Sequence, residues 1–442
     1  MQVALVALAW VALAWGVTAP TSGTPAGARV ARLAADFGIR LFREAAGRRG
    51  DGNAAFSPHG AAAVLGALQL ATAGPSRHQI EAAMGFGINE PGVALELRRL
   101  RKQLGGPGQR LAAAEGLFVA RELALAPGVI TRFVHTLGRR PAQVDFQQPQ
   151  QARAILNAWV QNHTQGMIRD FLPPGAAGPG TRLVLATAVY FKGSWLQPFP
   201  AAATRRRLFH KADGSTAAVP MMEQTAKLNY GEFATPQGLD YDVVELPYHG
   251  GAVSMLVAAP ARREAPLAAL AGALDADLVA AWAANMTRVP RVLVLPRFSL
   301  ETAWDLRASL KALGVRAVFE PEAADFTALS AEEPLFLAQA LQKVRIEVNE
   351  SGTEAASATA AVVHSRMAPL EILMDRPFLF IVRHNPTGPI TLCGVNGGPI
   401  NFLWGRWGPT TPYGSHHPMR SQRGATTPMW DQRGPINPVW SQ

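Results

Sequence analysis

A run of small residues, "TEAASATAAVVHS" at positions 353–365, constrains the fold more than any other stretch of this chain. If the run is extended, alternate residues from Thr353 to Val363 form a face of small, uncharged side chains, and the only carboxylate, Glu354, lies on the other face. No proline occurs between Glu350 and Arg366. The run can therefore exist as a solvent loop or as a strand inside a sheet. A plain Ala/Ser linker would explain the composition as well, so composition leaves both interpretations open.

The order of the expected elements indicates the fold class. Helical periodicity or small-residue helical composition occurs at 30–46, 58–74, 94–106 and 151–168, and apolar strand patterns follow at 181–195, 241–260, 291–304 and 376–395. Ser57 before Pro58 has the form of a helix N-cap followed by a proline in the first turn. Because helices come first and strands dominate later, we expect an α+β fold rather than repeated βαβ units.

The N-terminus predicts a secreted, extracellular protein. An apolar stretch at about 3–17 is followed by small and turn-forming residues, so residues 1–23 are interpreted as a signal peptide. The single cysteine, Cys393, excludes an intramolecular disulfide, and stability must come from a core built by a chain that is 48% hydrophobic. Sequons make Asn285 and Asn349 candidate glycosylation sites. The net charge of +10 suggests a polyanionic partner, for which the extracellular location favours sulfated glycans over nucleic acid.

Residues 396–442 differ in composition from the rest of the chain. They are rich in Gly, Pro and Trp, with near repeats such as "GPIN" at 398 and 434. Such a segment is not expected to join a packed core, and a disordered extension or a misjoined gene model would each explain it. One domain at 24–395 remains.

Motifs that carry catalysis are absent from the sequence. It contains no GxSxG, HExxH, Walker loop or paired CxxC. We therefore expect no enzyme activity, no catalytic residues, no cofactor and no metal.

Several segments resemble the serpin family, and they occur in the family's order over about residues 28–395. These segments are "NAAFSPHGAAAVLGALQLATAG" at 53, "AVYFKGSW" at 188, "VVELPYHG" at 243, "VLVLPRFSLE" at 292, "KVRIEVNESGTEAA" at 343 and "DRPFLFIVRHNPTG" at 375. The resemblance implies three β-sheets, about nine helices and an exposed reactive-centre loop at 350–371. It also implies a monomer that inhibits serine proteases as a suicide substrate, without crossing a membrane or binding nucleic acid.

The reactive bond implied by this resemblance is Arg366–Met367. A guanidinium pairs with the carboxylate in the specificity pocket of a trypsin-like protease, and the resemblance implies urokinase-type and tissue-type plasminogen activators as targets. The protease would be trapped as an acyl-enzyme when the loop enters the central sheet, which would restrain plasminogen activation and fibrinolysis. A non-inhibitory serpin that binds heparin or matrix is the alternative.

The resemblance also assigns accessory residues. Glu371 is half of an acidic pair expected to contact the protease, since Leu370 occupies the other position. A surface around Arg121 and Phe133 would bind vitronectin, although the neighbouring residues differ from the expected ones. The loop hinge is assigned to Glu350, Gly352, Thr353, Ala355 and Ala356, the breach to Trp195 and Thr187, and heparin binding to Arg98, Arg99, Arg101 and Lys102. A solvated helix face explains the last group equally well.

Overall fold

The computed structural model describes residues 25–49, 52–103, 109–351 and 369–398. By its internal contacts the chain divides into two units, Met1–Leu403 and Trp404–Gln442, and all described residues belong to the first. The predicted signal peptide and residues 399–442 of the predicted tail lie outside the described residues.

Helices dominate the first part of the described chain, as the sequence predicted. Ser57 caps α2 as expected, because its Oγ accepts a 3.1 Å hydrogen bond from the Gly60 backbone N–H and Pro58 follows it. The helices in the described residues are α1 (Pro25–Gly47), α2 (Pro58–Ala71), α3 (Gly74–Met84), α4 (Val93–Gln103), α5 (Pro127–Leu137), α6 (Pro149–His163), α7 (Leu267–Ala273), α8 (Ala276–Asn285) and α9 (Arg307–Ala312).

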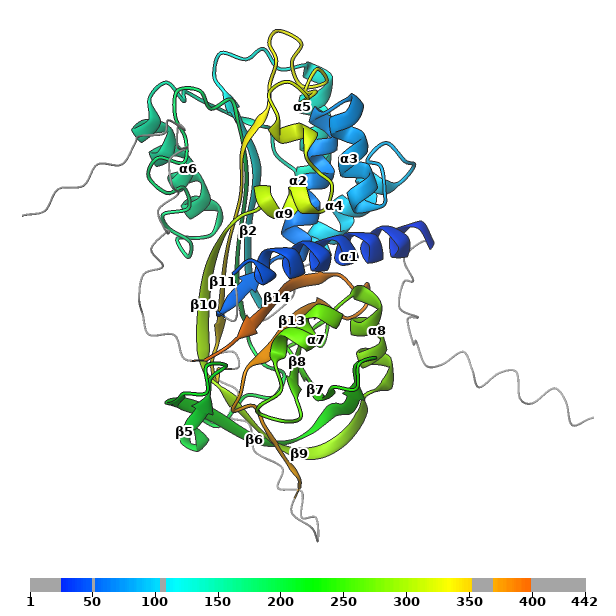
Figure 1. Ribbon diagram of the computed structural model, residues 1–442, viewed down its shortest axis with the longest axis vertical. Helices are drawn as coiled ribbons and strands as arrows, with labels where there is room; N and C mark the ends of the chain where they lie inside the picture. The colour runs from blue at the N-terminus through cyan, green and yellow to red at the C-terminus, as the bar shows by residue number, and fades with distance from the viewer. Residues whose placement is uncertain (1–24, 50–51, 104–108, 352–368, 399–442) are drawn as a thin grey trace, which may run out of the picture. The chain divides into compact units, whose positions relative to one another are not determined.

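A five-stranded sheet lies between two groups of helices. Its strand order is β10-β11-β4-β2-β3, and β4 and β11 at its centre are parallel. Figure 1 shows α6 on one face of this sheet and the cluster of α2 to α5 on the other. Its strands are β2 (Gln109–Ala120), β3 (Ala142–Val144), β4 (Leu183–Gly193), β10 (Phe298–Asp305) and β11 (Leu337–Val348).

The other described strands form one continuous hydrogen-bonded set in the order β1-β14-β13-β8-β7-β6-β9-β12, with β5 paired to β6. The expected second and third sheets are joined here, because the 19-residue strand β6 pairs with β9 along its middle and with β7 at its end. Its strands are β1 (Ala54–Phe56), β5 (Arg205–His210), β6 (Thr216–Ala234), β7 (Asp240–Pro247), β8 (Val253–Pro260), β9 (Thr287–Pro296), β12 (Glu371–Leu373), β13 (Phe378–His384) and β14 (Ile390–Asn396).

Helix α2 is central to the core. All of its residues are buried, which confirms the small-residue helix predicted after Pro58. Cys393 of β14 is also buried, and this burial raises the pKa of its thiol well above the usual value. Among the described residues, no single helix is long and apolar enough to cross a membrane, and only α7 with α8 passes that test as a pair, bent by 100°.

Candidate functional site

The centre of the five-stranded sheet is the place where a further strand could enter. β4 and β11 are direct neighbours from the pair Leu337–Leu183 to the pair Glu347–Lys192. Because they are parallel, a chain that turned back after β11 would run antiparallel to both of them. The residues that follow, 352–368, lie outside the described residues. They include the predicted reactive bond Arg366–Met367 and the predicted hinge residues Gly352, Thr353, Ala355 and Ala356.

The described part of the hinge is held by side chains from distant segments. Glu350 Oε1 accepts a 2.8 Å hydrogen bond from Thr204 Oγ1 and lies 3.6 Å from Arg297 Nη1. The backbone carbonyl of Glu350 accepts a 3.2 Å hydrogen bond from the Phe199 N–H. These contacts join the start of the loop to the segment between β4 and β5 and to the turn before β10.

Trp195 fixes the residue before Glu350. Its indole Nε1 donates a 2.8 Å hydrogen bond to the carbonyl oxygen of Asn349. The indole is stacked on the Tyr248 ring, with centroids 4.4 Å apart and an interplanar angle of 9°. This stacking holds the donor at the end of β11.

Thr187 lies far from this hinge, although the sequence analysis placed it in the same region as Trp195. It occupies the middle of β4, opposite Gln342 of β11 and Glu115 of β2. Eight positions of extended chain correspond to roughly 26 Å at about 3.3 Å per residue. The grouping is therefore wrong in position, because Thr187 lies in the middle of β4 and Trp195 lies beyond the end of that strand, at the hinge. Thr187 Oγ1 is buried and has no hydrogen-bond partner among the described residues.

The other end of the predicted loop is held by β12, which pairs in parallel with β9. Arg207 Nη1 donates a 3.0 Å hydrogen bond to Glu371 Oε1, and the same guanidinium pairs with Glu223. The Glu371 side chain remains 45% exposed, so it lies at the surface with a cationic partner already in place.

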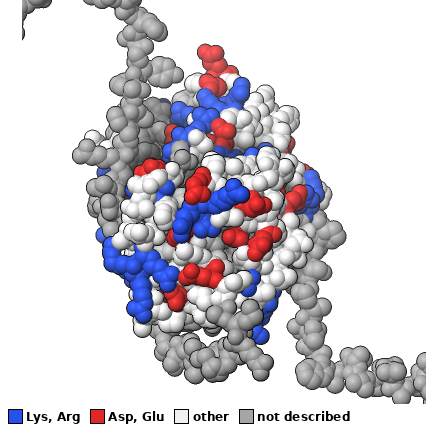
Figure 2. Space-filling view, turned by 60° about the horizontal axis from the view of Figure 1, so that its bottom comes forward, with Lys and Arg blue, Asp and Glu red and all other residues white. Residues whose placement is uncertain are grey.

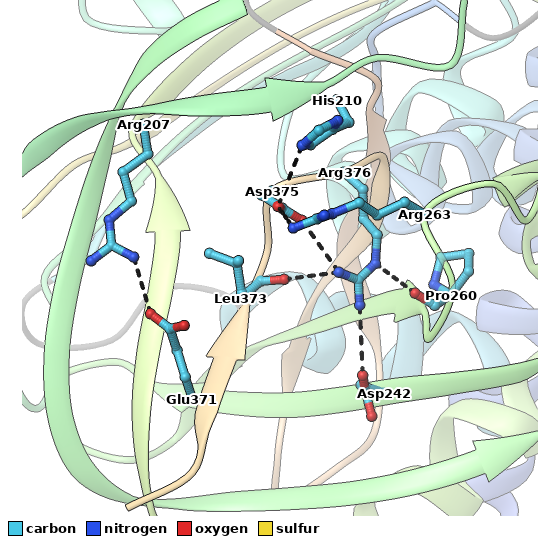
Figure 3. A network of polar contacts seen from close by, with 9 residues as sticks. All are labelled: Arg207, His210, Asp242, Pro260, Arg263, Glu371, Leu373, Asp375 and Arg376. Atoms are coloured by element: carbon cyan, nitrogen blue, oxygen red, sulfur yellow. Dashed lines mark hydrogen bonds and ion pairs between the residues drawn. The ribbon is translucent and has the colours of Figure 1, made fainter. Parts of the chain in front are cut away.

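A denser network follows β12 and is drawn in Figure 3. Asp375 Oδ2 accepts a 2.5 Å hydrogen bond from Arg263, while Asp375 Oδ1 accepts one of 3.2 Å from Arg376. Arg376 also donates to the carbonyl oxygens of Pro260 and Leu373, at 2.7 and 3.2 Å. The His210 N–H donates a 2.7 Å hydrogen bond to the Asp375 carbonyl. Because the Asp375 side chain is only 4% exposed, breaking these contacts would leave a buried carboxylate with fewer partners.

The two ends of the predicted loop therefore differ in their attachment. The Glu350 end continues directly from β11 and is held by contacts with Phe199, Thr204 and Arg297. The Glu371 end pairs with β9 and is tied through Asp375 and Arg376 to β5, β7 and β8. A break in the chain between these ends would leave the first segment attached to β11 and the second to the larger sheet.

Comparison with known proteins gives the family. The Serpin (serine protease inhibitor) family model matches residues 32–396. The chain is a serpin. It is an inhibitor of serine proteases and not itself an enzyme, as the sequence predicted.

Individual relatives agree with this assignment. Plasminogen activator inhibitor 1 of Sus scrofa is 53% identical over 366 residues, which cover 82% of this serpin and 91% of the relative. Glia-derived nexin of Mus musculus is 37% identical over 370 residues, with 83% and 93% covered. The crystal structure of native protease nexin-1 with heparin superposes with a TM-score of 0.80 at 34% identity, covering 84% of this serpin and all of that chain.

The predicted heparin-binding residues of the serpin lie on α4, but they do not form one outward surface. Arg99 lies 3.9 Å from Glu96 on its own helix. Arg101 Nε lies 3.9 Å from Glu115 Oε2 of β2, and burial raises the pKa of Glu115. Arg101 is thus directed toward a buried carboxylate, while Arg98, Arg99 and Lys102 remain partly or fully exposed.

Basic residues also occur far from α4. β5 carries Arg205, Arg206 and Arg207 in succession, of which the first two are exposed. Figure 2 shows one group of Lys and Arg at the edge of the face turned to the viewer, beside areas where acidic and basic side chains alternate. The net positive charge of the serpin is therefore not confined to α4.

The predicted vitronectin surface is only half accessible. Arg121 is 61% exposed and lies 4.0 Å from Asp145. Phe133 is only 1% exposed, because α5 packs its apolar side against α2 and α4. The Phe133 ring belongs to the core and is not part of the exposed surface, so vitronectin binding stays a prediction that depends on Arg121 and its neighbours.

The two candidate glycosylation sites have different surroundings. Asn285 is exposed at the end of α8, where its Nδ2 donates a 2.8 Å hydrogen bond to the Ala281 carbonyl. Asn349 is half-buried at the hinge, and its Oδ1 accepts a 3.0 Å hydrogen bond from the Ser351 N–H. Attachment of a glycan to Asn349 would therefore disturb the hinge, whereas Asn285 is free of that constraint.

Sequence reasoning missed the partners that hold the loop ends. Thr204 and Arg297 contact Glu350, while Arg263 and Asp375 meet across more than a hundred residues. No local pattern marks any of these residues. The charged Glu350 just before a run of small residues was the one available indication that a distant cation should be sought.

Proposed function

We propose that this serpin is a secreted suicide-substrate inhibitor of trypsin-like proteases, with urokinase-type and tissue-type plasminogen activators as its targets. The observation that carries the proposal is the parallel pairing of β4 and β11 in the sheet from which the predicted loop departs. The identity to plasminogen activator inhibitor 1 over most of the chain supports the choice of protease.

The physical driving force is an exchange of sheet pairing. Insertion of residues 353–363 between β4 and β11 would break one parallel ladder and form two antiparallel ones. Antiparallel pairing is slightly more stable per residue, and the number of ladder hydrogen bonds increases. One face of the inserting segment carries only small, uncharged side chains, so its burial leaves no charge without a partner.

Cleavage makes this insertion possible without removing β12. The protease serine Oγ would attack the Arg366 carbonyl carbon, and the bond to Met367 would break as its nitrogen leaves with a proton. The ester joins the protease to the segment that stays attached to β11. As that segment enters the sheet, the protease moves with it and its active site is deformed before water can hydrolyse the ester.

The proposal also includes secretion, a protease contact and two further partners. The predicted signal peptide supports secretion. Glu371 is a candidate contact for the protease, although the ion pair between Glu371 and Arg207 must then rearrange or be shared. Heparin is a candidate partner because the solved nexin-1 relative was crystallised with it. Vitronectin is a weaker candidate, with Arg121 as the only accessible residue of the predicted pair.

Incubation with urokinase-type plasminogen activator tests the proposal. We expect a complex that survives denaturation on a gel, together with loss of protease activity, and we expect Arg366→Ala to form no complex. Arg383→Ala is a matched control, because it also removes an arginine, but from the described body of the serpin.

Two results would contradict trapping. Cleaved serpin with fully active protease would mean that the loop is a substrate without productive insertion. Intact serpin with active protease would favour the alternative of a non-inhibitory, heparin- or matrix-binding serpin, which heparin affinity chromatography would then examine.

A further inference from the structure

A cavity of about 250 Å³ lies between α4 and the five-stranded sheet. It is bounded by β2 and β4, by the start of α2 and by β14. Apolar walls come from Leu111 and Val189. The polar residues of the lining on which a ligand could act are His59, Arg101, Lys102, Glu115, Arg139 and Thr391.

Three polar atoms of this lining are buried without a hydrogen-bond partner among the described residues. They are His59 Nε2, Arg139 Nη1 and Thr391 Oγ1. His59 is buried at the first turn of α2, and Thr391 is buried in β14. Buried polar groups normally have a partner, and an unpaired one destabilises the fold. Three such atoms around one cavity indicate a shared polar ligand.

The charges around the cavity indicate the sign of that ligand. Arg101, Lys102 and Arg139 face a single carboxylate, Glu115, which lies 3.9 Å from Arg101 Nε. Burial lowers the pKa of Arg139, and repulsion from Arg101 lowers it further. Positive charge is therefore in excess, and the two guanidinium groups lack enough anionic partners.

The arginines are also positioned by their surroundings. The Arg139 guanidinium lies over the Trp159 ring, 5.4 Å from its centroid. The Arg101 guanidinium packs on Gly138, where a Cβ atom would approach it to 2.9 Å. Gly138 ends α5 with a φ of +71°, a conformation that favours glycine. The two donors are thus held in place at the cavity before any ligand binds.

We propose that this cavity binds a small tetrahedral oxyanion, a phosphate or sulfate group, between Arg101 and Arg139. Guanidinium groups suit such oxyanions because they donate two hydrogen bonds in one plane. Neutral His59 and Thr391 supply hydrogen bonds at the buried end. The inference goes beyond the proposed inhibition and does not rest on it.

Bound oxyanion would link elements that are otherwise separate. It would join α4 and the end of α5 to the start of α2 and to β14, beside the strands β2 and β4. A ligand that binds only the native arrangement stabilises it in proportion to its occupancy. The expected consequence is a higher unfolding temperature at saturating oxyanion.

Titration of the full chain with inorganic phosphate and with sulfate tests the proposal, using sodium chloride at equal ionic strength as the reference. We expect a saturable rise in unfolding temperature with either oxyanion, and one site per chain by equilibrium dialysis with radiolabelled phosphate. Arg139→Gln should weaken phosphate binding about tenfold or more, since it removes a charge-assisted hydrogen bond. Arg98→Gln is the matched control, because Arg98 lies on α4 with Arg101 and Lys102 but does not line the cavity.

Glu115→Gln should bind phosphate or sulfate more tightly than the parent protein. Because misfolding would weaken binding, a gain of binding cannot be explained by it. Charged Glu115 repels the oxyanion. The titratable groups that line the cavity with Glu115 are Arg101 and Lys102 of α4, Arg139 after α5 and neutral His59 of α2. In the parent protein, binding of sulfate, whose charge stays constant in this range, should tighten as the pH falls and Glu115 takes up a proton. In Glu115→Gln, binding should be tighter at neutral pH and this part of the pH dependence should be lost.

Three outcomes would overturn the proposal. One is an unfolding temperature that rises no more with phosphate or sulfate than with chloride. The second is equal weakening by Arg98→Gln and Arg139→Gln, which would indicate surface screening. The third is binding of heparin but of neither inorganic oxyanion, which would make these residues part of a polysaccharide surface.

Discussion

Thr204 Oγ1 donates a 2.8 Å hydrogen bond to Glu350 Oε1, and this bond joins the start of the predicted reactive loop to a segment 146 residues earlier in the chain. Together with Arg297, Thr204 keeps the Glu350 carboxylate in place at the end of β11. The strength of these contacts sets how easily the first loop residues leave their position.

Replacement of Glu350 by alanine should loosen this hinge. We expect the free energy of unfolding to fall by about 2 kcal/mol, because a hydrogen bond to a charged group and a partly buried ion pair are lost together. We also expect faster loss of inhibitory activity during incubation without protease. Glu347→Ala is the control, because Glu347 lies in β11 three residues before Glu350 and pairs with Lys192 and Arg345 rather than with the hinge. Equal effects of the two substitutions would show that the hinge contacts have no special role.

Trp195→Phe should remove one hydrogen bond at the hinge while keeping an aromatic ring on Tyr248. The expected cost is about 1 kcal/mol, and amide hydrogen exchange at 346–351 should become faster. Trp304→Phe is a matched control, because the Trp304 Nε1 donates a 2.7 Å hydrogen bond to the Ala55 carbonyl, away from the hinge. The interpretation fails if Trp304→Phe accelerates exchange at 346–351 to the same extent.

Asp375→Asn should weaken the attachment of β12. The Arg376 side chain is 12% exposed and would lose the nearer of its two carboxylate partners, the other being Asp242 at 3.8 Å, so we expect destabilisation by about 2 kcal/mol. We also expect faster spontaneous loss of inhibitory activity, since β12 would separate from β9 more readily. Arg263→Gln removes only the more exposed partner and should cost less than about 1 kcal/mol. An unchanged rate of activity loss in Asp375→Asn would show that β12 detachment does not limit this process.

His59 should make the stability of the protein depend on pH. Burial, reinforced by Arg101, lowers the pKa of His59 from 6.5 to about 4. The unfolded chain therefore binds a proton below pH 6.5 that the native protein does not bind until about pH 4. His59 stabilises the native state fully above pH 6.5, and up to about 3 kcal/mol is lost as the pH falls toward 4.

The comparison of the parent protein with His59→Gln isolates this contribution. The difference in their unfolding free energies, measured by denaturant titration, should change in this pH window. Glu115 acts in the opposite direction, because its raised pKa lets the native protein gain stability as the pH falls. A constant difference between pH 6.5 and pH 4 would contradict the assignment to His59.

Phe133→Ala and Arg121→Ala together should show whether Phe133 contributes to stability and Arg121 to vitronectin binding. Removal of this fully buried ring should cost about 3–5 kcal/mol in unfolding free energy. Arg121→Ala should be nearly neutral for stability, because its pair with Asp145 is exposed and long. Vitronectin binding that persists in folded Phe133→Ala but is lost in Arg121→Ala would agree with the structure. The reverse pattern would mean that the α5 surface opens on binding.

Local patterns were sufficient for the family and for part of the secondary structure, while elements such as α3, α5 and the long strand β6 were not predicted. Ser57-Pro58 correctly marked the start of α2, and the apolar pattern around 183–193 identified a strand buried in a sheet. These features depend on neighbours within one turn or one strand, so the sequence displays them directly. The reactive bond Arg366–Met367 stays a prediction from sequence.

Tertiary structure alone decided the roles of residues whose partners are distant in the chain. Phe133 was expected at the surface and is buried, Thr187 lies in the middle of β4 rather than beside Trp195 at the hinge, and Arg101 turns toward Glu115. Thr204 and Arg297 could not be found from sequence, because a hydrogen bond or an ion pair requires only proximity and leaves no periodic pattern. The sequence by itself determined which segments form helices, strands and a strand-compatible loop. The packing of those segments determined which charges meet, and therefore how each end of the loop is held.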